Sequence, residues 1–219
     1  VGTVIAYTTL ASLGYYWPAL LIAPLIGFAL GALIQFSIIQ RIKNNAALSI
    51  VATFGLSMII QEVVRMTFGA APKRIMPPIS GTFGMFGIEY EWYRIFAAIA
   101  SIIAIGSFFI FLKSTKLGVW MRAVRHDRDT ATTMGIPTQQ IYLFTFGIGF
   151  AMAAIGGVIA APITTVDFRT GVDILPFCFM AVIIGGLGNL PGTVAAAVLL
   201  AFLEGVISGF ATPTIARIF

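Results

Sequence analysis

The chain has 219 residues, of which 59% are hydrophobic and only 10% are charged, and its mean hydropathy is +1.00. A soluble domain carries about 25% charged residues, so this composition excludes an ordinary soluble domain. The formal net charge of +5 does not indicate a nucleic-acid binder, since the basic residues are not interleaved with aromatic residues in a soluble patch. In a membrane chain, Lys and Arg instead indicate which side of the bilayer a loop occupies.

Apolar stretches that are long enough to cross a bilayer recur along the chain. Residues 1–13 are too short to span alone and lack the charged leader of a signal peptide, so we expect the end of a helix that starts earlier. A helix of about 20 apolar residues spans a hydrocarbon core of about 30 Å. Four stretches meet this criterion: residues 17–40, 46–66, 93–112 and 141–161. The sequence therefore predicts an all-α, polytopic membrane helix bundle.

Near the C-terminus, a shorter apolar run at residues 174–184 leads into I-I-G-G-L-G-N-L-P-G and an apolar helix at 193–210. This glycine-rich motif predicts a broken or re-entrant helix at membrane depth, where irregular backbone is tolerated only inside protein or beside a polar cavity. Gly186, Gly188 and Asn189 are therefore candidates for lining a substrate pathway, with free backbone groups for a zwitterion. The alternative is a tight interfacial turn whose glycines allow helices to pack closely. Residues after 210 resemble the approach to a further helix.

Polar residues inside the apolar stretches provide further pathway candidates. A carboxylate at membrane depth is costly and indicates a functional or pairing role. The small, polar stretch in the second span admits either a substrate or a neighbouring helix. These candidates are Thr53, Gly55, Ser57 and Glu204. Glu62 and Arg65 are three residues apart on a helix, and we expect them to form an ion pair near the outer interface.

The distribution of basic residues predicts the orientation of the chain. Seven of its 13 Lys and Arg residues lie in the turn at 41–43 and in the segment 113–128. Alternating spans place both segments on one side of the membrane, which the excess of positive charge assigns to the cytoplasm. Residues 67–92 then form an extracytoplasmic loop.

Residues 118–137 form the most hydrophilic segment between two spans. Gly118 marks the start of this segment, and Gly135 and Pro137 mark its end, so we expect a short cytoplasmic helix of about four turns. Arg122 and Arg125 recur there at helical spacing. One interpretation is a solvated loop that only fixes the topology. The other is a docking element that enters a groove of a soluble partner.

Three sequence blocks carry a resemblance to a known family. D-T-A-T-T-M-G, ending at Gly135, resembles the E-A-A-x-x-x-G signature in the coupling loop of ABC importer permeases, with Asp in place of Glu and Thr in place of the first Ala. The longer run G-V-W-M-R-A-V-R-H-D-R-D-T-A-T-T-M-G-I is similar to that loop in the branched-chain amino acid permease family of the LivH type. T-F-G-L-S-M-I-I-Q at 53–61 and G-G-L-G-N-L-P-G-T-V at 185–194 are similar to the same family. The blocks occur in the family's order, so the resemblance covers nearly the whole chain.

The resemblance implies that residues 1–219 are a single transmembrane permease domain, truncated at both ends, of a binding-protein-dependent importer for branched-chain or related amino acids. It implies a multi-pass protein of the bacterial cytoplasmic (inner) membrane. The implied partners are a second homologous permease subunit, as a homodimer or heterodimer, two cytoplasmic ATPases and an extracytoplasmic substrate-binding protein. The implied ATPase-coupling residues are Arg122, Arg125, Asp129, Ala131 and Gly135. A small residue at 131 and a glycine at 135, four apart on one helix, would leave a bare face for the partner.

Alternative functions differ in energy source and substrate. The sequence has no G-x-x-x-x-G-K-[ST] phosphate-binding loop, so we expect no cofactor on this chain and expect ATP and Mg²⁺ on the partner ATPases. A related permease for urea or short amides stays open, as does a passive channel, which would not need a docking segment. The sequence does not indicate an enzyme, because it has one histidine, no cluster of metal ligands and no nucleophile motif. We therefore expect neither catalytic residues nor a metal site. The single cysteine, Cys178, excludes an internal disulfide.

Overall fold

The computed structural model describes residues 2–13, 15–42, 46–69, 71, 73, 75, 77–78, 81–85, 88–167, 169–186 and 188–210. The chain divides into two compact units, Val1–Asp167 and Phe168–Phe219. Most of the described residues are helical, which confirms the predicted all-α fold of a polytopic membrane protein. The predicted continuations at Val1 and beyond residue 210 lie outside the described residues.

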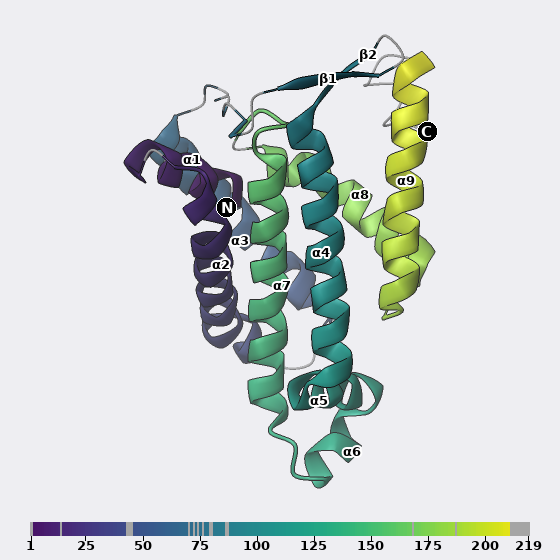
Figure 1. Cartoon of the computed structure of the whole chain (residues 1–219). Helices are drawn as coiled ribbons and strands as arrows, with labels where there is room; N and C mark the ends of the chain where they lie inside the picture. The colour runs from purple at the N-terminus through teal and green to yellow at the C-terminus, as the bar shows by residue number, and fades with distance from the viewer. Residues whose placement is uncertain are drawn as a thin grey trace. The chain divides into compact units, whose positions relative to one another are not determined.

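The first unit contains every predicted full-length span (Figure 1). Among the described residues, four helices are long and apolar enough to cross a membrane, and they coincide with the four predicted stretches. The helices of this unit are α1 (Gly2–Leu13), α2 (Trp17–Ser37), the short η1 (Ile39–Arg41), α3 (Ala46–Phe68), α4 (Trp92–Ser114), α5 (Lys116–His126), α6 (Arg128–Thr133) and α7 (Thr138–Ala160).

Helices α2 and α7 pack backbone against backbone. They run in opposite directions along each other, because Gly27 lies against Ala154 and Gly31 lies against Phe146 and Phe150. A Cβ atom added to Gly31 would lie 2.8 Å from the Cβ of Phe150 and 2.9 Å from the carbonyl oxygen of Phe146. The Gly-x-x-x-Gly spacing in α2 therefore places two bare positions on one helical face, as in membrane helices that approach closely.

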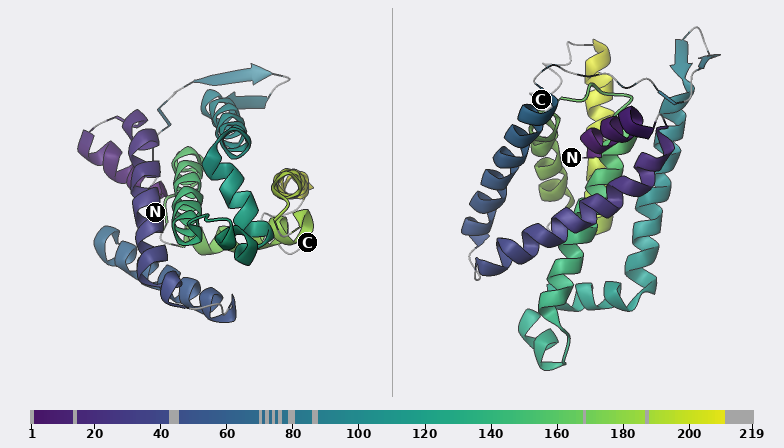
Figure 2. Two further views of the ribbon diagram at one scale, coloured as in Figure 1. Left: turned by 90° about the horizontal axis from the view of Figure 1, so that it is seen from below. Right: turned by 90° about the vertical axis from the view of Figure 1, so that its left-hand side faces the viewer.

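The antiparallel arrangement places the end of α2, and with it Arg41, toward the end of the unit where α7 begins (Figures 1 and 2). Helices α5 and α6 lie at this same end, between the end of α4 and the start of α7. The described basic residues of the turn and of the 113–128 segment therefore share one end of the unit, as the alternation of spans predicts.

At the opposite end of the unit, the predicted extracytoplasmic loop contains local structure that the sequence did not reveal. Strands β1 (Thr82–Met85) and β2 (Ile88–Glu91) form an antiparallel hairpin. Upstream of the hairpin, Lys73 and Val166 exchange two backbone hydrogen bonds, with N···O distances of 3.0 and 2.8 Å, which tie the loop to the segment after α7. The amino group of Lys73 lies 4.5 Å from the ring centroid of Tyr7.

The second unit is a hairpin of two apolar helices, α8 (Thr170–Gly185) and α9 (Leu190–Phe210). Both begin earlier than predicted, by four and three residues, so the connection shortens to Gly186–Asn189. Helix α8 has 16 residues, which correspond to a length of about 24 Å, less than the hydrocarbon thickness of about 30 Å.

Candidate functional site

The candidate coupling segment begins at a tight corner between α4 and α5. The hydroxyl of Thr115 accepts a hydrogen bond from the backbone N–H of Gly118 at 3.1 Å and so caps α5. Gly118 packs directly on the backbone of Leu112, where no side chain would fit. The guanidinium of Arg122 donates to the carbonyl oxygen of Leu112, one of the carbonyls that the end of a helix leaves without an intrahelical partner. Arg122, a predicted ATPase contact, therefore ties α5 to the end of α4.

The segment is not the single helix that its sequence predicts. Helix α5 ends at His126, and Asp127 adopts an extended conformation before α6 begins. The carboxylate of Asp127 accepts hydrogen bonds from the backbone N–H groups of Asp129 at 2.9 Å and Thr130 at 3.2 Å. The hydroxyl of Thr130 donates to the same carboxylate, and these hydrogen bonds lower the pKa of Asp127 below its usual range. An N-cap of this kind starts a new helix and breaks the predicted one.

Helix α6 ends in a turn that needs a glycine at position 135. The backbone N–H of Gly135 donates to the carbonyl of Thr132 at 3.0 Å, and that of Ile136 donates to the carbonyl of Ala131 at 3.1 Å. This pair of bonds closes a helix with a left-handed residue, and Gly135 has a φ of +80°. A Cβ atom at Gly135 would meet nothing within 4 Å, so the backbone conformation, and no steric contact within the described part of the chain, explains the glycine.

Ala131 and Gly135 do not share the predicted helical face. Ala131 is buried and packs with Val124 and Ile141 inside the segment's own small core. Gly135 lies beyond the end of α6 and is exposed. The spacing prediction was wrong here because the helix stops before position 135. Arg125 and Asp129 are exposed, as a docking role requires.

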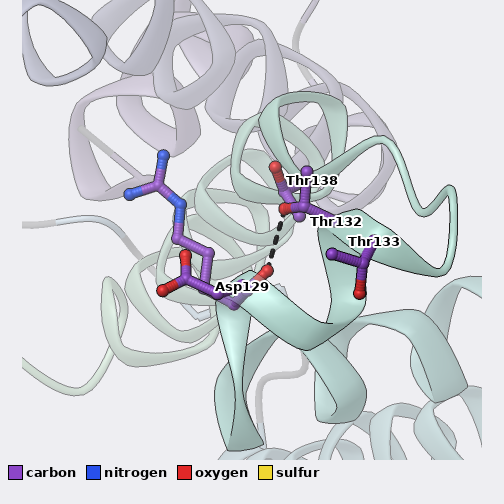
Figure 3. Close-up of a pocket in the computed structure, with 5 residues that line it drawn as sticks. Asp129, Thr132, Thr133 and Thr138 are labelled. Atoms are coloured by element: carbon purple, nitrogen blue, oxygen red, sulfur yellow. Dashed lines mark hydrogen bonds between the residues drawn. The ribbon is translucent and has the colours of Figure 1, made fainter.

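An open hollow lies on the surface of this segment (Figure 3). It has a volume of about 720 Å³, and its lining residues, which come from α6 and the start of α7, are Arg128, Asp129, Thr132, Thr133 and Thr138. The hydroxyl of Thr132 donates to the backbone carbonyl of Arg128 at 2.8 Å. The guanidinium carbon of Arg128 lies 5.5 Å from the ring centroid of Tyr142. Each of the five lining residues carries a side chain that can form hydrogen bonds.

The predicted pathway residues of α3 lie on an open helix. Thr53 and Ser57 are half-buried, and Gly55 is exposed with no atom within 4 Å of an added Cβ. The amide of Gln61 donates to the hydroxyl of Ser57 at 3.1 Å. On the next turn, Arg65 and Glu62 form the predicted ion pair at 3.4 Å.

The glycine-rich motif of the second unit forms a tight turn. Gly186 and Gly188 have φ values of +89° and +86°, which favour glycine. The side-chain oxygen of Asn189 accepts from the backbone N–H of Gly192 at 3.3 Å and caps α9. Gly192 lies against the carbonyl of Gly185, so the two helices touch through their backbones. The turn and its close packing account for these residues without a ligand, and their pathway role stays a prediction.

The remaining candidate, Glu204, lies in α9 and is half-buried. The pathway candidates are thus divided between α3 of the first unit and the turn and α9 of the second. Among the residues that the structure describes, no group of three His, Cys, Asp or Glu side chains could hold a metal ion.

Three features escaped the sequence interpretation although each has a local signal. The N-cap at Asp127 was predictable from the sequence, because Asp is favoured at helix N-caps and the residues that follow can form a helix. Thr115 precedes α5 in the same way. The Gly-x-x-x-Gly spacing at Gly27 and Gly31 is a known signal of close membrane-helix contact.

Comparison with protein families matches residues 1–219 to the family described as "Branched-chain amino acid transport system / permease component". The chain belongs to this family. Membership confirms the resemblance carried by the three sequence blocks. Together with the apolar helices, it makes the chain a multi-pass membrane protein of a transport permease family.

Individual relatives are distant but cover most of the chain. The "High-affinity branched-chain amino acid transport system permease protein LivH" of Escherichia coli (strain K12) is 25% identical over 199 residues, 86% of this chain and 63% of the relative. Methanocaldococcus jannaschii has two relatives, LivH and LivM, both named probable branched-chain amino acid transport permease proteins. Its LivH is 24% identical over 95% of this chain and 68% of its own length. Its LivM is 26% identical over 88% of this chain and 56% of its own length. The "Fructose import permease protein FruF" of Bifidobacterium longum is 26% identical over 91% of this chain and 57% of its own length. The chain thus spans about 63% of the first of these curated relatives. No solved structure matches the chain.

Proposed function

We propose that the chain is the transmembrane subunit of a binding-protein-dependent ABC importer of the cytoplasmic (inner) membrane, and that it moves branched-chain amino acids. The observation that carries this proposal is the family match over residues 1–219. The chain is the non-catalytic part of the complex. ATP and Mg²⁺ belong to two cytoplasmic ATPases, and an extracytoplasmic protein delivers the substrate.

The geometry of the α5–α6 segment supports ATPase coupling. Helix α6 is held at both ends, by the Asp127 cap and by the Gly135 turn, and it lies on the far side of α5 from the body of α4 (Figures 1 and 2). Its exposed Asp129 and the neighbouring hollow offer polar contacts to a soluble subunit. The partner would receive a compact, internally packed element, which costs less conformational entropy on binding than a flexible loop.

The relatives support a second permease subunit without choosing its identity. The chain is nearly as similar to a LivH protein as to the LivM protein of the same organism, at 24% and 26% identity. Two permeases of one family in one organism suit a heterodimer, and a homodimer fits the same similarity.

The substrate assignment rests on the family and needs a direct test, because a fructose permease is as similar as the amino acid permeases. The full-length protein should be purified with its ATPases and reconstituted in proteoliposomes with its binding protein. We expect ATP-dependent uptake of labelled leucine, isoleucine or valine, and none without ATP. If fructose alone is taken up, the substrate is a sugar and the proposed amino acid substrate is wrong. Uptake that is independent of ATP would replace it with a passive channel.

A further inference from the structure

Lys73 places its ammonium group between two aromatic rings, which we call the Tyr7–Phe68 corner. Its amino nitrogen lies 4.5 Å from the ring centroid of Tyr7 in α1 and 5.9 Å from that of Phe68 at the end of α3. The two rings meet edge to face, with centroids 6.4 Å apart and an interplanar angle of 86°. Among the described residues, no carboxylate forms an ion pair with Lys73. The corner is therefore a binding site for a cation, and the chain's own ammonium occupies it.

The loop that carries Lys73 is held in place without this side chain. The backbone of Lys73 exchanges two hydrogen bonds with Val166, and Ile75 is only 3% exposed and belongs to the core of the unit. Because the ammonium sits on a flexible stem of four carbons, it can leave the rings while the backbone stays where it is. Lys73, Tyr7 and Phe68 are all half-buried, so the corner is open on one side.

The corner lies at the end of the polar face of α3. Ser57, Gln61 and Phe68 are spaced i, i+4 and i+11, which places them on one side of a helix. All three are half-buried, whereas Ile59 on the opposite side is 62% exposed. A polar face on a membrane-spanning helix is turned toward protein or a water-filled path. The corner is the end of this face that lies beside the predicted extracytoplasmic loop (Figure 2).

We propose that the Tyr7–Phe68 corner binds the primary ammonium group of the transported substrate, and that Lys73 takes the place of this group when substrate is absent. The inference rests on the proposed transport of amino acids. A substrate with a primary ammonium can replace Lys73, because it offers the rings the same charged group, and the cation–π contact is kept throughout the exchange. An uncharged sugar cannot replace it. The corner would thus distinguish amino acids from sugars at the entrance.

The test follows the Lys73 ammonium by NMR. The full-length permease, assembled with its ATPases in lipid nanodiscs, is reductively methylated with isotope-labelled formaldehyde, which keeps the charge of each lysine. The signal of Lys73 is identified by its absence in Lys73→Arg. The aromatic rings should shift this signal upfield, and millimolar L-leucine should reverse the shift. Isopentylamine, which is leucine without its carboxylate, should do the same, whereas isocaproate, which is leucine without its ammonium, and fructose should leave the signal unchanged.

Substitutions should change the binding of isopentylamine in opposite directions. Phe68→Leu removes one ring and should weaken binding, measured by equilibrium dialysis, by about threefold or more. Lys73→Met removes the competing cation and should tighten binding by about the same factor, because the corner is then always vacant. Tyr7→Phe keeps the aromatic ring and is the matched control, with unchanged affinity. If Lys73 only fastened the loop, Lys73→Met would not tighten binding.

The proposal is overturned if the Lys73 signal responds neither to leucine nor to isopentylamine, or if it responds equally to isocaproate. Weaker binding of isopentylamine by Lys73→Met would also overturn it. The titration uses the unsubstituted protein, so it gives an answer even if Phe68→Leu does not fold. Leucine uptake without a response of Lys73 would refute the corner and leave the proposed function intact. A response to isopentylamine without uptake of any amino acid would refute the function and leave the corner.

Discussion

The hydroxyl oxygens of Tyr16 and Tyr93 lie 3.0 Å apart, and both side chains are buried. Tyr16 also donates to the carbonyl of Val158, and Tyr93 donates to the carbonyl of Ile159 at 3.0 Å. The pair thereby joins the starts of α2 and α4 to the last turn of α7, at the end of the unit opposite to the coupling segment.

We expect Tyr93→Phe to lower the free energy of unfolding by about 1 kcal/mol, because a buried carbonyl loses a hydrogen-bond donor while the ring packing is kept. Thermal unfolding in lipid nanodiscs measures the change. Tyr15→Phe is the matched control, since Tyr15 is 71% exposed. Equal effects of the two variants would contradict a structural role for the buried pair.

The contact between α2 and α7 predicts a strong asymmetry between two glycines. Gly31→Leu should destabilise the protein by about 1–3 kcal/mol or prevent assembly, because the side chain would meet the backbone and Cβ of α7. Gly149→Leu, on α7 but with open space around its Cβ, should be tolerated. Yield of the folded protein and its unfolding temperature would show the difference, and similar behaviour of both variants would refute the packing.

Gly135 allows backbone strain to be separated from contact with a partner. Gly135→Ala should destabilise the α6 turn by about 1 kcal/mol or more, because a side chain disfavours its positive φ. Gly135→Asn tolerates that conformation better and should restore most of the ATPase binding measured by co-purification. If Asn binds ATPase as poorly as Ala while the turn stays folded, the exposed position itself contacts the ATPase, and the defect arises from bulk.

The cap at Asp127 predicts a pH dependence. The hydrogen bonds from Thr130 and Asp129 lower the pKa of this carboxyl group in the folded protein. The carboxylate therefore stabilises α6 fully at pH values above the pKa of the unfolded chain, which is about 4. This stabilisation is lost as the pH falls through the lower pKa of the folded state. Protection of the Asp129 and Thr130 amides from hydrogen exchange should therefore decrease in acid. Asp127→Asn should make this protection independent of pH in that range, and an unchanged profile would contradict the cap.

Asn189 tests whether the glycine-rich turn lines the substrate pathway. Asn189→Asp keeps an acceptor for the N–H of Gly192 and should preserve stability, whereas Asn189→Ala should cost about 1 kcal/mol. Normal stability with altered uptake in Asn189→Asp would support a pathway role. Gly188→Leu cannot serve this purpose, because its positive φ makes any side chain strained.

The spans were predictable from the sequence because crossing a bilayer depends on apolar length, which each segment carries by itself. The pairing of Tyr16 with Tyr93 was not, since the two residues are 77 positions apart and nothing local to either indicates the other. The coupling segment lies between these cases. Its charge and position were apparent, but a helical spacing that continues past the end of α6 at Thr133 places Ala131 and Gly135 wrongly on one face.

The Gly27 and Gly31 contacts bear on how motion travels through the first unit. Where long side chains separate two helices, a rotamer change can compensate for a small movement of one helix against the other. Helices whose backbones are in direct contact cannot compensate in this way. Since α7 begins at Thr138, three residues after the Gly135 turn, a tilt imposed on α6 would carry α2 along with α7 as one stiff body. A displacement of α6 would then reach the tyrosine pair at the other end of the unit.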